Sequence, residues 1–349
     1  MPIELQLTAP GKLSFMPYED PPLQSGEVRA RAIVSGISHG TEMNLFTGNN
    51  PFVEKEFDRE LRLFVPRTEP LADALLLGYE WVGEVMEIGP DVSRFEVGDR
   101  VHLPFRHRQT HTFPEDLETA LGLVSPLPDG FPPEQGVFLA LAGVALQAIH
   151  DAHIKLGDAV VVLGMGVIGL LAVQLAKRNG ASWVAAVDPL KSRRELALRY
   201  GANAAYDPAE EDVAFAVKTN TPYRGADAAI EFSGNYRALS DAIRVVQMGG
   251  TVVAGGFYRG GGTPLTLGAE WHHNRVTLLS SMGVWDCPHR DHPTWNRERV
   301  HQTATELIAS GKLATDRLVT HRIPYEKAAE AYLLIQSQPE NALKVVLTY

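Results

Sequence analysis

The sequence lacks most of the features that suit a protein to an oxidising compartment or to nucleic acid. It contains a single cysteine, Cys287, so neither an intrachain disulfide nor a zinc site built from several cysteines can form. It has 32 Lys and Arg against 42 Asp and Glu, a formal net charge of −10, without any block of basic residues. Such an acidic chain is a poor candidate for binding nucleic acid or an anionic membrane surface.

Targeting signals and long uninterrupted apolar runs are also missing. Residues 1–13 lack the basic n-region and the apolar h-region of a signal peptide. The longest apolar stretch, residues 159–176, is interrupted by Gly164, Gly166 and Gly169, which favours a strand, a turn and a helix over a membrane span. We therefore expect a cytoplasmic enzyme that acts on a small-molecule substrate, with no nucleic-acid partner and no membrane partner.

What the chain does have is length and apolar content for two domains. With 349 residues, 45% of them hydrophobic, it can bury a large core without disulfides or metals. Residues 1–128 are predicted to be β-rich, because stretches such as 26–38 and 81–105 are β-branched or alternating and contain turn signals. Within them, residues 49–77 are rich in charge and proline. We interpret this segment as a substrate-side lid, with a surface excursion of no function as the alternative.

From about residue 129 the pattern changes to short apolar strands that alternate with amphipathic helices. This alternation predicts right-handed crossovers and a parallel sheet covered on both faces, which is an α/β doubly wound arrangement. A strand at 276–284 is expected to extend that sheet. Two helices within 297–338 and a terminal strand at 342–349 are expected to follow.

The strongest local signal is the pattern G-x-G-x-x-G at residues 164–169, directly after an apolar strand and at the start of a helix. Gly164 permits a tight turn, Gly166 lets the backbone approach a pyrophosphate, and Gly169 lets the helix pack closely on the strand. The free N–H groups at the helix N-terminus favour a phosphate. The motif therefore predicts a dinucleotide cofactor.

Asp188 ends the next strand and predicts which dinucleotide is bound. A carboxylate there accepts both hydroxyls of the adenosine ribose and repels a 2′-phosphate, so the sequence favours NAD over NADP. Lys191, Arg193 and Arg194 follow and could soften that repulsion, although basic residues early in a helix are more often solvated. The alternative is that Asp188 only caps the helix that begins at Lys191.

In combination, these segments resemble the medium-chain dehydrogenase/reductase family over essentially the full length of the chain. The resembling segments are residues 78–101 (GYEWVGEVMEIGPDVSRFEVGDRV), the cofactor strand and turn, EFSGN at 231–235 and GGTVVAGG at 249–256. The resemblance implies a GroES-like catalytic domain formed by residues 1–128 and 286–349, and a Rossmann domain formed by residues 129–285. It also implies a homodimer formed through the edge of the Rossmann sheet. It adds further candidate cofactor contacts: Val167, Ile168, Arg193, Ser233, Gly255 and Gly256.

The zinc alcohol dehydrogenases of that family carry their metal ligands at positions that hold other residues here. The Cys ligand of a G-I-C-G-T-D segment falls on Ser38 or His39, the His ligand of a G-H-E segment falls on Tyr79, and the third ligand falls near Ala140. The four-cysteine structural zinc lobe is missing. Since zinc needs three protein ligands and at most His39 and Glu80 remain, we expect no metal and a zinc-free branch. The SGISxGTE and GYE segments look most like bacteriochlorophyllide-type dehydrogenases, a local likeness that does not extend to the substrate.

Without a metal, a side chain or a water relay has to take the hydroxyl proton as hydride leaves the substrate. By resemblance, the candidates lie around residues 38–39 and 79–80. Histidine titrates near neutrality, which makes His39 a candidate general base, while Tyr79 could orient the substrate oxygen. Glu80 could hold a partner or tune its pKa, and Glu42 is a further polar candidate. The alternatives are that His39 is a turn residue and that Glu80 is a structural ion-pair partner.

The sequence leaves open the roles of two histidine clusters and two tryptophans. The histidines have no known ligand spacing, so solvated or pocket-lining side chains are favoured over a metal site. The tryptophans are either platforms for a sugar or ring, or packing residues. The residues are His102, His107 and His111 in one cluster, His272, His273, His289 and His292 in the other, and Trp285 and Trp295.

The sequence thus favours an NAD-dependent oxidoreductase that interconverts a secondary alcohol, on a polyol, a sugar or a similar polar substrate, and its ketone. A zinc-free reductase of quinones or enones is a second hypothesis, although such relatives commonly use NADPH, which Asp188 opposes. A non-catalytic nucleotide-binding protein is a third. The polar candidates His39, Glu42, Tyr79 and Glu80 speak against it.

Overall fold

The computed structural model describes residues 1–49, 55–67, 75–119, 121–221, 224–282 and 294–349. The chain divides into two compact units, the first of residues 1–139 and 317–349 and the second of residues 140–316. One unit inserted into the other is the organisation that the resemblance implies. Both boundaries, however, lie later than the expected 128 and 285.

The later boundary near residue 316 follows from the packing of one helix. Helix α9 (Arg297–Ala309) belongs to the second unit, because Val300 packs over Gly143 of α3 (Leu139–Asp151). Just before α9, the ring of Trp295 meets the ring of His150 edge-on, with 4.4 Å between the centroids. Trp295 is therefore engaged in packing within the second compact unit, whereas residues 286–349 were all assigned to the catalytic domain by the resemblance.

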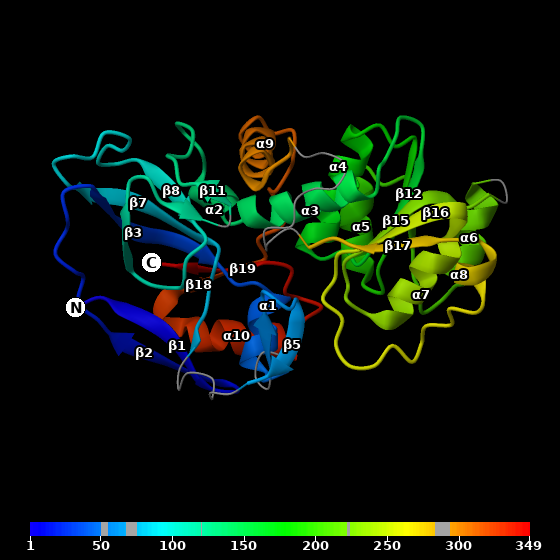
Figure 1. Cartoon of the computed structure of the whole chain (residues 1–349), viewed down its shortest axis with the longest axis horizontal. Coiled ribbons are helices and arrows are strands. Elements are labelled where there is room, and N and C mark those ends of the chain that lie inside the picture. The colour runs from blue at the N-terminus through cyan, green and yellow to red at the C-terminus, as the bar shows by residue number, and fades with distance from the viewer. Residues whose placement is uncertain (50–54, 68–74, 120, 222–223, 283–293) are drawn as a thin grey trace. The chain divides into compact units, whose positions relative to one another are not determined.

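The first unit is built on a largely antiparallel sheet with the strand order β18–β19–β3–β7–β8, and β9 also pairs with β3 (Figure 1). The last strand of the chain lies antiparallel to β3, with Val346 opposite Gly36. This pairing brings residue 344 next to the loop that follows β3. The strands are β3 (Glu27–Gly36), β7 (Trp81–Ile88), β8 (Arg100–Leu103), β9 (Thr110–Pro114), β18 (His321–Pro324) and β19 (Val345–Thr348).

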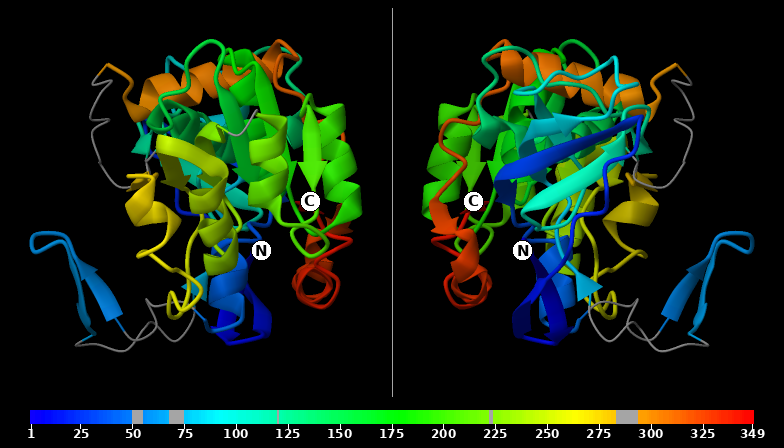
Figure 2. Two further views of the ribbon diagram at one scale, coloured as in Figure 1. Left: turned by 90° about the vertical axis from the view of Figure 1, so that its right-hand side faces the viewer. Right: turned by 90° about the vertical axis from the view of Figure 1, so that its left-hand side faces the viewer.

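Smaller elements complete this unit around a core of Leu5, Leu77, Tyr325, Tyr332 and Leu347. The segment expected to be a lid contains a two-stranded ribbon, β4–β5 (blue in Figure 2), and residues 50–54 and 68–74 lie outside the described residues. The elements are β1 (Ile3–Ala9), β2 (Lys12–Pro17), α1 (Thr41–Phe46), β4 (Lys55–Asp58), β5 (Leu63–Pro66), β6 (Leu75–Leu76), β10 (Glu118–Thr119), β11 (Gly122–Leu123), α2 (Pro133–Gly136), η2 (Tyr325–Lys327) and α10 (Ala328–Ser337).

The second unit contains a six-stranded parallel sheet with the order β14–β13–β12–β15–β16–β17. The strands are β12 (Ala159–Leu163), β13 (Trp183–Val187), β14 (Ala204–Tyr206), β15 (Ala226–Glu231), β16 (Val246–Ala254) and β17 (Thr277–Ser280). The predicted doubly wound sheet and its extension by the strand within 276–284 are confirmed. Strand order reverses between β12 and β15, and open α/β sheets bind their ligands at the carboxyl ends of the strands at such a point.

Helices flank both faces of this sheet (Figure 2). α4 and α5 pack together over β12, β13 and β14, whereas α6 packs on α7, which lies over β12, β15 and β16. All five residues of β12 are buried, as expected for a strand covered on both faces. The helices are α4 (Val167–Arg178), α5 (Lys191–Arg199), α6 (Val213–Asn220), α7 (Tyr236–Val245) and α8 (Glu270–His273).

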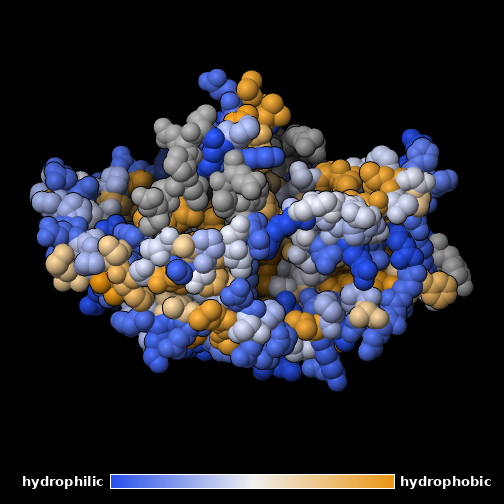
Figure 3. Space-filling model, turned by 90° about the horizontal axis from the view of Figure 1, so that it is seen from below, coloured by the Kyte–Doolittle hydropathy of each residue, from blue (hydrophilic) through white to orange (hydrophobic). Residues whose placement is uncertain are grey.

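The surface seen in Figure 3 carries small groups of apolar residues scattered among polar ones, which is ordinary for a folded protein. Within the described ranges, none of the helices has the length and hydrophobicity that a bilayer span requires.

Candidate active site

The dinucleotide end of the site is the turn between β12 and α4. The chain turns at Gly164, whose φ is +87°, and a Cβ there would lie 2.7 Å from the backbone N of Ser233. A Cβ on Gly169 would lie 1.9 Å from the carbonyl oxygen of Gly164, so the helix can pack this closely only with glycine. By contrast, a Cβ on Gly166 would meet nothing within 4 Å. Gly166 is the N-cap residue of α4, and as a glycine it has no side chain that could accept a hydrogen bond from the first N–H groups of the helix. The helix N-terminus, which begins at Val167 and Ile168, thus leaves its first N–H groups to a phosphate.

Asp188 stands beside this turn and joins it to the next strand. Its Oδ2 accepts a hydrogen bond of 2.8 Å from the N–H of Met165, and its Oδ1 accepts one of 2.8 Å from the N–H of Leu190. Leu190 is the N-cap residue of α5, so Asp188 does not occupy the capping position that the alternative required. Each carboxylate oxygen keeps a lone pair with which it can accept a ribose hydroxyl.

The basic residues after Asp188 have other partners. Arg194 donates to the carbonyl oxygens of Asp188 and Pro189 and forms an ion pair of 2.8 Å with Asp207. Lys191 is exposed and lies 3.9 Å from Glu195, and Arg193 is half-buried in the first turn of α5. The guanidinium of Arg194 therefore links the segment that follows β13 to the segment that follows β14.

A buried carboxyl group that sequence reasoning missed lies at the carboxyl end of β15. Glu231 has no exposed surface and accepts hydrogen bonds from the N–H groups of Ser233 (2.6 Å) and Gly234 (3.1 Å) and from the hydroxyls of Ser233 and Tyr258. Burial raises the pKa of Glu231. The carbonyl oxygen of Glu231 accepts bonds of 2.9 Å from Gly255 and Gly256, so the candidate residues of three segments meet at the switch point. The signal was present in the segment EFSGN, as an acidic residue that ends an apolar strand.

In the first unit, two hydroxyl groups meet where the loop after β3 approaches β7. The oxygens of Ser38 and Tyr79 are 2.6 Å apart in a hydrogen bond, and the N–H of Thr41 lies 3.4 Å from Ser38 Oγ. Ser38 is buried and Tyr79 is half-buried. Burial and then the neighbouring Glu80 carboxylate raise the pKa of Tyr79, which outweighs the lowering by the hydroxyls of Ser38 and Thr41. Tyr79 is therefore protonated at neutral pH.

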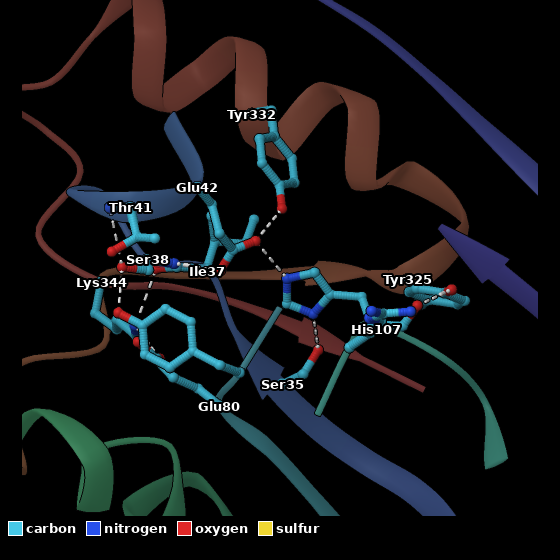
Figure 4. A network of polar contacts seen from close by, with 12 residues as sticks. Ser35, Ile37, Ser38, Thr41, Glu42, Glu80, His107, Tyr325, Tyr332 and Lys344 are labelled. Atoms are coloured by element: carbon cyan, nitrogen blue, oxygen red, sulfur yellow. Dashed lines mark hydrogen bonds and ion pairs between the residues drawn. The ribbon is translucent and has the colours of Figure 1, made fainter. Parts of the chain in front are cut away.

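Glu80 forms a buried ion pair with Lys344, which sequence reasoning did not find (Figure 4). The ammonium of Lys344 donates to Glu80 Oε2 and, at 2.9 Å, to the carbonyl oxygen of Ile37. Burial raises the pKa of Glu80 to about 7 even though Lys344 opposes the rise. The two residues are 264 positions apart, so no local pattern announces the pair.

Glu42 holds the Ser38 loop through its carboxylate (Figure 4). Its Oε1 accepts a 2.8 Å bond from the N–H of Ser38, while its Oε2 bonds the hydroxyl of Tyr332 and lies 2.9 Å from Nε2 of His107. Burial alone would raise the pKa of Glu42, but His107 and the hydrogen bonds hold it below its usual value. His107 is completed by Ser35, whose Oγ lies 2.7 Å from Nδ1. His39 follows Ser38 and is half-buried.

The two histidine clusters differ in burial. His102, His107 and His111 are all buried rather than solvated, and burial lowers the pKa of His111 to about 4. His272 and His273 are exposed, as expected for solvated side chains. His289, His292, Trp285 and Cys287 lie outside the described residues. Among the residues that the structure describes, no three His, Cys, Asp or Glu side chains gather in a way that could hold a metal ion.

The second unit carries a dinucleotide turn on a doubly wound sheet, and the two ends of the chain form a GroES-like unit. Together these features define an alcohol dehydrogenase-like oxidoreductase that acts on CH–OH donors. Comparison with protein families matches residues 24–150 to the alcohol dehydrogenase GroES-like domain and residues 167–294 to the zinc-binding dehydrogenase. The chain is 33% identical to a D-guloside 3-dehydrogenase of Escherichia coli over 99% of both proteins. It is 28% identical to an L-threonine 3-dehydrogenase of Pyrococcus abyssi, over 89% of this chain and 88% of that one. This chain belongs to the medium-chain, zinc-binding dehydrogenase family.

Solved structures agree on the fold. An oxidoreductase of unknown specificity from Escherichia coli superposes with a TM-score of 0.80 at 23% identity, covering 100% of this chain and 99% of that one. A 2R,3R-butanediol dehydrogenase from Bacillus subtilis gives a TM-score of 0.78 at 23% identity, with 100% of each chain covered. The family predicted from the sequence motifs is confirmed.

At the positions that the resemblance assigns to the zinc ligands, Ser38, Tyr79 and Ala140 do not supply the donors that a catalytic zinc takes, which leaves at most His39 and Glu80. Ser38 and Tyr79 present hydroxyl groups that are bonded to each other, in place of a thiolate and an imidazole. Ala140 offers no lone pair, and the carboxylate of Glu80 is engaged by Lys344. Zinc sites in proteins are built from thiolate, imidazole and carboxylate donors.

Proposed function

We propose that this protein catalyses the NAD-dependent interconversion of a secondary alcohol, on a polyol, sugar or similar polar substrate, and its ketone, without a catalytic zinc. The observation that carries the proposal is the pair of hydroxyls, Ser38 and Tyr79, at positions where zinc-dependent members of the family hold metal ligands. A site made of neutral hydrogen-bonding groups can bind a hydroxyl or carbonyl oxygen without a metal.

The cofactor part of the proposal rests on the second unit. The N–H groups at Gly166, Val167 and Ile168 suit the pyrophosphate, and Asp188 suits the ribose hydroxyls and disfavours a 2′-phosphate. The nicotinamide supplies the hydride chemistry when it is bound. Ser233, Gly255 and Gly256 lie at the switch point, and we propose that they contact the part of the cofactor beyond the adenosine ribose and the pyrophosphate.

The substrate part rests on the relatives. D-guloside 3-dehydrogenase, L-threonine 3-dehydrogenase and (R,R)-butanediol dehydrogenase are each named for a substrate that carries a hydroxyl on a secondary carbon. The D-guloside enzyme matches over 99% of both proteins, which supports a sugar or polyol here.

Proton handling falls to the first unit. His39 remains the proposed general base, because it is half-buried beside Ser38 and histidine titrates near neutrality. Glu42 and Glu80 are only 1% and 0% exposed, and both carboxylates bond protein groups. We therefore assign these two residues positioning roles and leave contact with the substrate to Tyr79 and His39.

A cofactor and substrate panel tests the proposal. Wild-type protein is assayed with NAD and with NADP against secondary alcohols, polyols and glycosides, and in reverse against the matching ketones, quinones and enones. The proposal predicts turnover of a polyol or sugar with NAD in preference to NADP. Activity confined to quinones or enones with NADPH would replace it with the reductase hypothesis, and nucleotide binding without any turnover would replace it with a non-catalytic role.

A further inference from the structure

We infer that the hydroxyls of Ser38 and Tyr79 together form the subsite that binds the reacting oxygen of the substrate, in the place that a metal ion takes in zinc-dependent relatives. This inference rests on the proposed function and deepens it. It adds Ser38 as a catalytic residue and gives Lys344 a positioning role.

A count of hydroxyl protons shows that the three neighbouring hydroxyls of Ser38, Thr41 and Tyr79 have one donor to spare. Ser38, Thr41 and Tyr79 each carry one hydroxyl proton, and each hydroxyl oxygen can also accept. Bonds between Ser38 and Tyr79 and between Thr41 and Tyr79 use two of the three protons. One O–H is left to donate to an oxygen from outside the protein. Ser38 is buried, whereas Tyr79 is half-buried and Thr41 is exposed, so the group keeps surface that such an oxygen can reach.

The protonation state of Tyr79 suits this role. Burial is the largest cause that raises the pKa of Tyr79, and the Glu80 carboxylate adds to it. The phenol therefore keeps its proton through the neutral range and can donate to a carbonyl oxygen or to the alkoxide that develops during hydride transfer. A positioned donor of this kind typically contributes about 10²–10³-fold to kcat.

The pair is held in place from both sides by one ammonium group. Lys344 donates to the carbonyl oxygen of Ile37, the residue before Ser38, and to the carboxylate of Glu80, the residue after Tyr79 (Figure 4). The side chain of Lys344, the residue directly before β19, thus joins the two chain segments that carry the hydroxyls. The N–H of Ser38 is fixed separately by Glu42, at 2.8 Å. Donors that are already oriented need no reorganisation when charge develops on the substrate oxygen.

Two variants and a matched control test the inference. The test variants are Tyr79→Phe and Ser38→Ala. The control is Tyr18→Phe, which removes a phenol that bonds Thr110 in the same unit at the same 2.6 Å. For each protein, kcat, KM, the Kd for NAD and the thermal unfolding midpoint are measured with the best alcohol of the panel and with its ketone.

The inference predicts that Tyr79→Phe lowers kcat by about 10²–10³-fold and that Ser38→Ala lowers it by at least about tenfold. NAD affinity should be unchanged in both, and Tyr18→Phe should keep the wild-type kcat. Equal kcat in Tyr79→Phe and Tyr18→Phe would overturn the inference while leaving the proposed function intact, because the wild type would still turn over the alcohol. A wild type that turns over no CH–OH substrate would instead overturn the proposed function.

Should Tyr79→Phe fail to fold, Ser38→Ala decides, because a serine hydroxyl is removed with little change in volume. Loss of kcat in that variant, with a wild-type unfolding midpoint and wild-type NAD affinity, supports the oxygen subsite. Wild-type kcat in that variant overturns the role of Ser38.

Discussion

Replacement of Lys344 by methionine should destabilise the first unit strongly and in a pH-dependent manner. Lys344 and Glu80 are 1% and 0% exposed, so the substitution leaves a carboxylate in the protein interior without its counter-charge. Breaking a buried ion pair by removing one partner typically costs about 3–5 kcal/mol of unfolding free energy. We expect the loss to approach that size only above pH 7, where Glu80 is ionised in the wild type, while the apolar side chain of methionine fills most of the space of the lysine.

The pH dependence has a definite sign. The pKa of Glu80 in the folded protein is raised from 4.5 to about 7, and loss of the Lys344 ammonium removes a group that lowers it. A carboxyl group with a raised folded-state pKa contributes stability that is fully present below its unfolded pKa and is lost as pH rises through the folded pKa. Between pH 4.5 and about pH 7 both proteins lose this contribution with the same slope, because Glu80 is protonated in both folded states. The deficit of Lys344→Met should therefore be smallest below about pH 7 and grow above it, where Glu80 ionises in the wild type but stays protonated in the variant. Its slope should be at most about 1.4 kcal/mol per pH unit.

Urea unfolding at several pH values measures this deficit. Hydrogen–deuterium exchange of peptides from β3 and β7 assigns the transition to the first unit. The double variant Lys344→Met with Glu80→Gln should recover much of the loss, because no charge remains to be buried. The control Lys327→Met, which removes an exposed lysine 3.9 Å from Glu330, should leave the midpoint unchanged. A Lys344→Met protein as stable as the control at pH 8 would refute the reasoning.

Three further predictions concern the cofactor and the proton. Asp188→Ala should weaken NAD binding by at least about tenfold and narrow the preference for NAD over NADP, since each hydrogen bond to a charged group contributes about 1.5–3 kcal/mol. Fluorescence titration with both cofactors checks this, and a wild type that prefers NADP contradicts the assignment of Asp188. His39→Ala should lower kcat by about 10²–10⁴-fold and change the pH dependence of kcat, at nearly constant NAD affinity. Steady-state kinetics across pH check this, and an unaltered kcat and pH profile would remove His39 from the mechanism. Gly169→Ala should raise the Kd for NAD and lower the unfolding midpoint, because its Cβ would lie 1.9 Å from the oxygen of Gly164; calorimetry checks both quantities, and wild-type values would show that the turn tolerates the methyl group.

Local features of the site could be predicted from the sequence. The turn at 164–169 and the position of Asp188 depend on residues that are close in the chain, and alternation of strands and helices determines the sheet around them. The same reasoning missed Glu231, although it ends one of those strands, because a single acidic residue gives no periodic signal.

Long-range pairing explains what could not be predicted. Lys344 meets Glu80 only because β19 returns beside β3, and His107 meets Glu42 across 65 positions. The buried state of His107 follows from that partner and not from its neighbours in the sequence. The division between the compact units falls near residue 316 and not at the expected residue 285 for a similar reason, since Val300 packs on a helix more than a hundred residues earlier in the chain.

The central claim is that this member of the family binds and oxidises its alcohol without zinc, and paired measurements of metal content and turnover on one preparation test it most directly. Zinc is determined by elemental analysis and kcat is determined with NAD, before and after treatment with a chelator and again after zinc is added back. The account predicts substoichiometric zinc throughout and the same kcat at every stage. A kcat that falls with the chelator and returns in proportion to zinc, up to one tightly held ion per chain, would contradict it.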